Sequence, residues 1–111
     1  MRQFTNLESI EEIDEFIQSN TLAFIYISRP DCSVCHGLMP QVQETMVPFT
    51  EIKMAHISAA EVEEIAGHFS IFTVPVLLLF VNGKEYLREA RIVHMDLFED
   101  KIRKIYKNVV G

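Results

Sequence analysis

The sequence has no tryptophan, only two cysteines, and four residues each of glycine and proline. Of its 111 residues, 49% are hydrophobic, which together with so little glycine and proline is typical of a compact globular protein. The length predicts a single domain spanning residues 1–111 that buries its core without disulfide staples.

Long hydrophobic runs are absent as well. The longest covers residues 74–81, whereas a helix that spans a bilayer needs about 20 apolar residues. Residues 1–6 have neither an apolar stretch nor a small-residue cleavage site, so no signal peptide is visible. We therefore expect a cytosolic protein without a membrane partner, in which a lone cysteine pair is catalytic, redox-sensing or metal-binding.

Basic residues are in the minority, with 10 Lys and Arg against 16 Asp and Glu and a net charge of −6 at pH 7. Nucleic acids bind basic surfaces, so this balance argues against a nucleic-acid partner. Acidic residues gather at positions 8–15 and basic ones at positions 101–107, and we expect both groups on solvated helix faces.

The sequence does contain a Cys-Ser-Val-Cys motif, formed by Cys32, Ser33, Val34 and Cys35 shortly after an apolar run at residues 22–27. Two thiols at this spacing fit one turn of a helix. Where a helix begins at Cys32, its unpaired N–H groups and its dipole lower the thiol pKa from about 8.5 into the range of about 3.5 to 7.5. Cys32 is then a nucleophile at neutral pH, and Cys35 can attack the mixed disulfide that it forms.

The N-terminal part of the chain predicts a strand, a helix and a second strand. A short strand near Phe4 precedes a helix that Ser9 and Glu12 open as a capping box. Residues 22–28 are apolar, aromatic or β-branched almost throughout, which favours a strand covered on both faces.

The middle of the chain predicts a helix over 32–46, kinked at Pro40, and then a strand over 52–57. A second capping box at 58–61 predicts another helix that Gly67 ends. The inward side chains of that helix are expected to be Val62, Ile65 and Ala66.

The last part of the chain predicts a hairpin and a helix. Asn82 and Gly83 form a strong turn signal between a strand over 76–81 and an antiparallel strand over 86–93. The final helix, capped by Asp96, buries Phe98, Ile102, Ile105, Tyr106 and Val109. The predicted class is α/β, a central mixed sheet with helices on both faces in the order β-α-β-α-β-α-β-β-α.

Taken together, these motifs make the chain resemble the thioredoxin family over essentially its whole length. The resemblance rests on Cys-x-x-Cys after a buried strand, on the aliphatic strand that Pro75 opens, and on the Asn82-Gly83 turn; Pro40 stands where thioredoxins kink their active-site helix. It implies a thioredoxin fold with a cis Pro75 facing the cysteines. It also implies that Thr73, Val74 and Pro75 bind an extended substrate segment, paired to the Val74 backbone. By itself the sequence shows only that Pro75 opens a strand.

The chain departs from the family pattern inside and around the motif. Asp31 replaces a tryptophan, Ser33-Val34 replaces Gly-Pro, and Tyr26 stands in place of a buried aspartate. The companion lysine corresponds to Met54, and a glycine of the groove corresponds to Arg91 or Ile92. A phenol and a thioether cannot take a proton from Cys35 near neutral pH, so we expect weak general reducing activity.

Several alternatives compete with this interpretation. Cys32 to His36 also matches the C-x-x-C-H of haem attachment, although a packed helix after His36 argues against it. Zinc needs two further ligands, and no second pair has ligand spacing among His36, His56, His68 and His94. A protonated His36 favours a thiolate, whereas the charge of Asp31 opposes it. Tyr26 is expected to pack within its strand, and Arg29 and Arg91 are either solvated or select acidic substrates.

The function expected from the sequence is that of a cytosolic, monomeric thiol-disulfide oxidoreductase without a cofactor. Cys32 attacks and Cys35 resolves, and the partners are protein disulfides and an upstream reductase such as a thioredoxin reductase. The alternative is a redox-sensing adaptor or binding module of the same fold, whose cysteines oxidise once and change the affinity for a partner without turnover.

Overall fold

The sheet is built around strand β2 (Leu22–Ser28), in which every residue is buried, as expected for a strand covered on both faces. The computed structural model describes residues 2–111 and places five strands in the order β1-β3-β2-β4-β5. Strand β3 (Lys53–Ser58) runs parallel to β2, and β1 (Thr5–Asn6) runs parallel to β3. Strands β4 (Val76–Val81) and β5 (Lys84–Ala90) are antiparallel to their neighbours, so the sheet is mixed.

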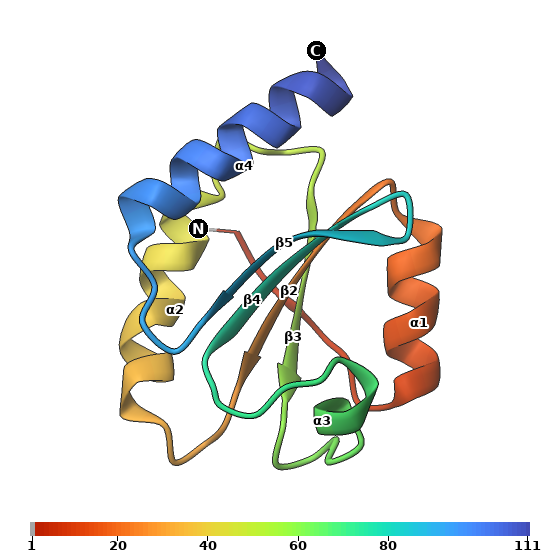
Figure 1. Ribbon diagram of the computed structural model, residues 1–111, viewed down its shortest axis with the longest axis vertical. Coiled ribbons are helices and arrows are strands. Elements are labelled where there is room, and N and C mark those ends of the chain that lie inside the picture. The colour runs from red at the N-terminus through yellow and green to blue at the C-terminus, as the bar shows by residue number, and fades with distance from the viewer. Residues whose placement is uncertain (1) are drawn as a thin grey trace.

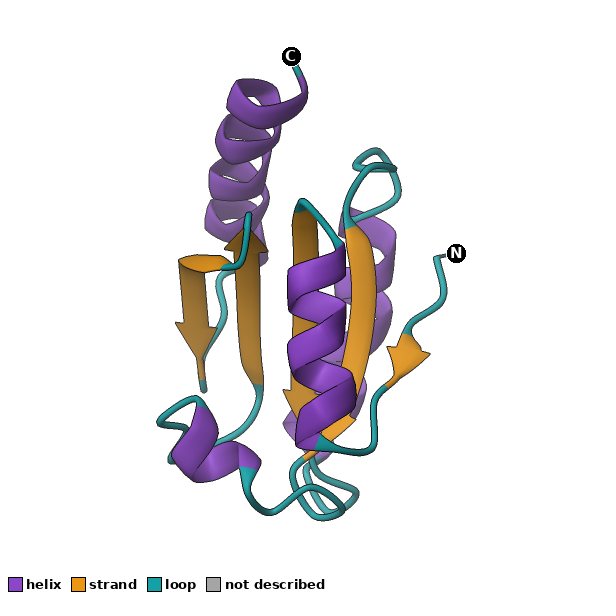
Figure 2. Cartoon of the chain, turned by 90° about the vertical axis from the view of Figure 1, so that its right-hand side faces the viewer, coloured by secondary structure: helices purple, strands orange, loops and turns teal. Residues whose placement is uncertain are grey.

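Helices cover both faces of this sheet. Helices α1 (Ile10–Ser19) and α3 (Ile65–His68) lie on one side, and α2 (Ser33–Thr45) and α4 (Met95–Val110) lie on the other (Figure 1). From the α1 side, the strands lie next to one another behind that helix (Figure 2). Each face of the sheet has its own apolar cluster, one beneath α1 and the other beneath α2 and α4. The predicted α/β class and thioredoxin-type element order are confirmed.

Local signals fixed the element ends where a side chain or turn type is decisive. The Ser9 hydroxyl accepts a hydrogen bond from the Glu12 N–H at 3.2 Å, and the Glu12 carboxylate accepts from the Glu8 N–H at 2.7 Å. Asn82 and Gly83 have φ values of 52° and 83°, the left-handed pair that a tight two-residue hairpin requires. Both predicted features are therefore present.

The predicted helix over 58–67 is wrong in its extent. Ser58 continues the β2–β3 ladder opposite Ser28, so its side chain cannot open a helix, and its hydroxyl is buried without a partner among the described residues. The chain then forms turns, and α3 has only 4 residues, with Gly67 inside it and Ala66 exposed.

Three further boundaries differ from the prediction. Strand β5 is predicted over 86–93 but begins at Lys84, because the two-residue turn brings Lys84 directly opposite Val81. It ends at Ala90, because Arg91 adopts a φ of 67°. His94 is the N-cap residue of α4, and Asp96 lies in the first turn of the helix. Val109 is 38% exposed because the end of α4 extends beyond the sheet.

We predict that helix α4 depends on Phe98. Its ring is 1% exposed and lies 5.8 Å from the ring of Phe24 on β2, so Phe98→Ala opens a cavity that costs about 3–5 kcal/mol. Urea unfolding should show a lower midpoint with an unchanged slope. The neighbouring Leu97 is 57% exposed, and Leu97→Ala should stay within about 0.5 kcal/mol of wild type. Equal losses in the two variants would contradict this packing.

Candidate active site

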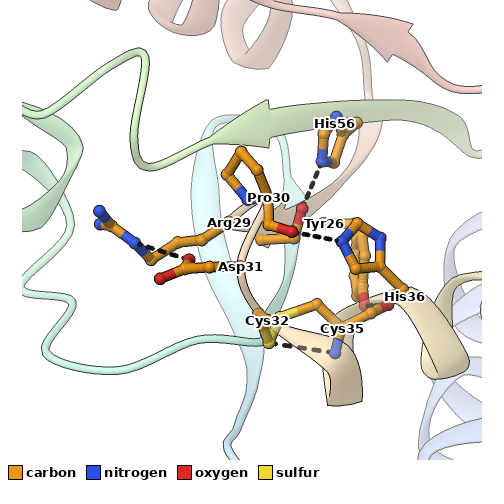
Figure 3. Close-up of a disulfide and its surroundings, with 9 residues drawn as sticks. Tyr26, Arg29, Pro30, Asp31, Cys32, Cys35, His36 and His56 are labelled. Carbon is orange, nitrogen blue, oxygen red and sulfur yellow. Dashed lines mark hydrogen bonds and ion pairs between the residues drawn. A yellow bond between two sulfur atoms is a disulfide. The ribbon is translucent and has the colours of Figure 1, made fainter.

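The two cysteines lie at the start of α2, shortly after the end of β2. Cys32 is the N-cap residue of α2 and forms a disulfide with Cys35, with the two Cα atoms 5.3 Å apart (Figure 3). The Cys32 sulfur also accepts a hydrogen bond from the Cys35 N–H at 3.1 Å. This contact uses one of the N–H groups that a helix start leaves unpaired. The sequence prediction that the helix opens at Cys32 is confirmed to within one residue.

The two sulfurs differ in their access to solvent. Cys32 is half-buried at the helix start, whereas Cys35 is 0% exposed and packs into the core. After His36 the chain continues as the packed helix α2, with Pro40 inside it, and Leu38 and Val42 are buried against the sheet. An incoming disulfide can therefore reach only the Cys32 side of the pair.

Tyr26 lies beneath the helix turn that contains the two cysteines and is hydrogen-bonded to it. Its side chain is fully buried in β2, and its hydroxyl donates a hydrogen bond to the Cys35 carbonyl at 2.5 Å. The ring stacks on Phe4 with the centroids 5.9 Å apart. Burial raises the pKa of Tyr26 to about 12, so its phenol stays protonated and acts as a donor at neutral pH. The expectation of a packing role is consistent with this contact.

The neighbour of Tyr26 on the adjacent strand β3 is His56, and Met54 lies two residues earlier in that strand. Register places Tyr26 opposite His56 in the β2–β3 ladder, whereas Met54 pairs with Phe24. The His56 ring nitrogens lie 2.6 Å from the Ser28 hydroxyl and 3.2 Å from the Asn6 side-chain oxygen. Burial lowers the pKa of His56, the nearby Glu61 opposes this effect, and His36 adds to it. The strand predicted over 52–57 includes His56, but only the register of the two strands reveals that His56 is the neighbour of Tyr26.

The polar residues around the motif are occupied by local contacts. The Nε2 of His36 turns back to the Pro30 carbonyl at 2.8 Å, as Figure 3 shows. The Nε of Arg29 lies 3.6 Å from the Asp31 carboxylate, whose side chain is 85% exposed. Solvent and Arg29 therefore screen the charge of Asp31 that sequence reasoning set against the Cys32 thiolate.

A groove of about 760 Å³ opens beside Cys32. The Val74–Pro75 bond is cis, as the resemblance implied, and Thr73, Val74 and Pro75 form one wall of the groove. The other walls come from α2 and from the segment after β5, with the further lining residues Asp31, Ser33, Val34, Gly37, Leu38, Gln41, Arg91, Ile92 and Val93. Among the predicted site residues, Tyr26, Cys35 and His36 stay behind the groove. Arg91 and Ile92 both line it, and only Arg91 has the positive φ that suits a glycine.

Within residues 2–111, no three His, Cys, Asp or Glu side chains gather closely enough to hold a metal ion. None of the helices described for residues 2–111 has both the length and the apolar character needed to cross a membrane.

We predict that the Tyr26 hydroxyl stabilises the fold below pH 10 and loses this effect above it. Tyr26→Phe removes one buried hydrogen bond, which should lower the free energy of unfolding of the oxidised protein by about 1 kcal/mol at pH 8. The pKa of Tyr26 is raised to about 12 in the folded protein, whereas an unfolded chain ionises near the ordinary value of about 10. Between these values the native state binds more protons, so wild-type stability falls as the pH rises.

Urea unfolding of both proteins from pH 8 to 12 measures this difference. The gap between wild type and Tyr26→Phe should be constant up to about pH 10 and should narrow above it, because the variant has no phenol at this position. A gap that widens with pH would show that Tyr26 is not held in its protonated form.

Known proteins resemble this chain in both sequence and structure. A family model described as Thioredoxin matches residues 5–107. The thioredoxin-like protein YdfQ of Bacillus subtilis is 50% identical over 111 residues, which cover 100% of this chain and 99% of that protein.

Two solved thioredoxin structures share the fold. Thioredoxin from Trypanosoma brucei brucei has a TM-score of 0.84 and 17% identity, over 95% of this chain and 92% of that one. Oxidised thioredoxin from Plasmodium falciparum has a TM-score of 0.83 and 19% identity, over 94% and 99% of the two chains. With a family match over nearly the full length and a half-identical relative, the chain belongs to the thioredoxin family.

Proposed function

We propose that the protein reduces protein disulfides, with Cys32 as the nucleophile and Cys35 as the resolving thiol. The observation that carries this proposal is the unequal burial of the pair: the Cys32 sulfur borders an open groove, and Cys35 is sealed beneath it. Members of the thioredoxin family are thiol-disulfide oxidoreductases, and this chain has their Cys-x-x-Cys pair as a disulfide.

The first step needs a thiolate at Cys32. The start of α2 supplies one, because helix N–H groups and the dipole favour negative charge there, and the Cys35 N–H already points at the Cys32 sulfur from 3.1 Å. The thiolate attacks one sulfur of the substrate, the substrate S–S bond breaks, and the other substrate sulfur leaves as a thiolate. A mixed disulfide now joins Cys32 to the substrate.

In the second step Cys35 loses its proton and attacks the Cys32 sulfur. The Cys32–Cys35 disulfide forms, and the remaining substrate sulfur leaves as a thiolate that takes up a proton. The two electrons come from the protein dithiol. Burial disfavours the charged form of Cys35, and Tyr26 cannot help because its pKa is raised to about 12. Water or His36 takes the proton, which makes resolution slow.

The substrate lies extended along the groove wall. The β4–β5 ladder begins at Val76, so the backbone of Val74 is outside it and can pair with a peptide beside the disulfide. Val74 is half-buried between the large groove and a second hollow of about 330 Å³ on its other side. Thr73 and Pro75, on either side of Val74, hold the substrate segment in place.

The redox chemistry also leads us to propose a partner and a cellular location. After each cycle the Cys32–Cys35 disulfide must be reduced again, so an upstream reductase such as a thioredoxin reductase is the proposed partner. The cytosol is the proposed location, because its reducing conditions maintain the dithiol. The chemistry uses no cofactor and requires only one copy of the chain.

We predict that Cys35→Ser traps substrates on Cys32. The variant can attack but cannot resolve, so incubation with insulin should give a mixed disulfide that dithiothreitol releases. Wild type should reduce insulin with repeated turnover when dithiothreitol regenerates it. Cys32→Ser, which keeps the other thiol, is the matched control and should give neither the trap nor turnover.

This experiment separates the two functions considered from the sequence. A redox-sensing adaptor oxidises once and gives no insulin turnover above the rate with dithiothreitol alone. A trap that forms on Cys35 in the Cys32→Ser variant would overturn the assigned roles.

We also predict how turnover depends on pH. If solvent takes the proton of Cys35, resolution should accelerate continuously from pH 7 to 9 as more thiolate forms. The pKa of Tyr26 is raised to about 12, so its phenol does not titrate in this range, and Tyr26→Phe should show the same profile as wild type. Stopped-flow decay of the mixed disulfide measures the step directly. A profile that flattens in Tyr26→Phe would make the phenol part of the proton path.

A further inference from the structure

Arg91 is held in an unusual backbone conformation at the rim of the substrate groove. Its φ is 67°, in the left-handed region that non-glycine residues rarely adopt. Its N–H donates a hydrogen bond to the Pro75 carbonyl at 2.9 Å, which ties this residue to the wall that faces the cysteines. The backbone therefore fixes where the side chain starts, although the guanidinium itself is exposed.

Among the residues that the structure describes around the groove, Arg91 is the cation that has no ion-pair partner. Glu89 nearby is paired with Lys101 at 2.8 Å, and Asp31 across the groove is paired with Arg29 at 3.6 Å. None of the ion pairs found within residues 2–111 includes Arg91. A protein with a net charge of −6 thus places an exposed cation, unpaired among residues 2–111, at the rim of the groove that contains its attacking sulfur.

We propose that Arg91 selects disulfide substrates that have an acidic residue beside the reacting cysteine. This proposal rests on the proposed function, because it requires that a peptide lie along Thr73–Pro75 while Cys32 attacks. A carboxylate of that peptide then pairs with the guanidinium of Arg91, which can donate two parallel hydrogen bonds to it.

The two sides of the substrate segment differ in charge. The second hollow, on the other side of Val74, is lined by Glu63 and by Arg29, which is already paired with Asp31, so the described residues that line it include no unpaired cation for a carboxylate. The selection therefore acts on one flank of the substrate cysteine only. Exposed apolar side chains border the large groove too, with Val34 61% and Ile92 76% exposed, and they accept the neighbouring apolar part of the peptide.

The test uses reduced wild-type protein and short peptides with one cysteine linked by a disulfide to a chromophoric thiol. The peptides differ at a single position on either side of that cysteine, which holds Glu, Gln or Lys. The measured quantity is the single-turnover rate constant for release of the chromophore at low peptide concentration. On one flank the Glu peptide should react about three- to fivefold faster than the Gln peptide, and the Lys peptide more slowly than either.

The variants separate local from overall charge. Arg91→Gln should abolish the preference for Glu over Gln, and Arg91→Lys, which keeps the charge but loses the two parallel hydrogen bonds, should show a smaller preference than wild type. Arg91→Gly, which suits the positive φ, removes the same charge without strain and should match Arg91→Gln. Lys107→Gln is the control for net charge, because Lys107 is an exposed cation in the last turn of α4 outside the groove; it should keep the wild-type preference. High salt should reduce the preference in wild type.

Each outcome has a separate meaning. Equal rates for Glu and Gln peptides on both flanks would overturn the selection while leaving the proposed function intact. A preference that survives in both Arg91→Gln and Arg91→Gly would overturn the assignment to this residue. Failure of every peptide to react, with Cys32 shown to be reduced, would overturn the proposed function and this inference with it.

Discussion

The complete burial of β2 constrains everything at the active site. A strand covered on both faces must fill its inner positions with apolar or fully satisfied side chains, because an unpaired polar group there costs about 1–3 kcal/mol. Tyr26 meets this requirement by giving its hydroxyl to the Cys35 carbonyl, and so connects the centre of the sheet to the first turn of α2. Both cysteines lie in that turn, Cys32 as the N-cap residue and Cys35 inside the helix. Because a tyrosine fills position 26, this position offers Cys35 a phenol and not an ionisable carboxylate.

The sequence predicted those parts of the molecule that short-range chemistry determines. The cysteine turn, the buried β2, the β4 strand and the Asn82-Gly83 hairpin each depend on residues close together in the chain, and they were found where expected. The cis Pro75 was different, because only family resemblance implied it. From its own neighbours, Pro75 shows no more than a strand start.

What the sequence did not predict depends on strand pairing or on backbone conformation, neither of which a local signal determines. Ser58 and Glu61 match a capping box, but Ser58 pairs with Ser28 as the last residue of β3, and helix α3 begins only at Ile65. His56 had no local signature as the neighbour of Tyr26, since only the register of two parallel strands brings them together. The choice between Arg91 and Ile92 likewise needed a backbone angle, which a sequence does not display.

Under the proposed function, two departures from the family pattern concern different steps of one reaction. Arg91 lies at the groove rim, where it can meet a substrate before and during the attack by Cys32. Tyr26 lies behind the groove, where its phenol donates to the Cys35 carbonyl and, with a pKa raised to about 12, does not take the Cys35 proton in the proposed resolution step. A chain that attacks selectively and resolves slowly keeps a chosen partner bound longer than a general reductant does. Under the proposed roles, such kinetics suit a narrow set of acidic substrates, and they depend on one residue inside the core and one at the surface.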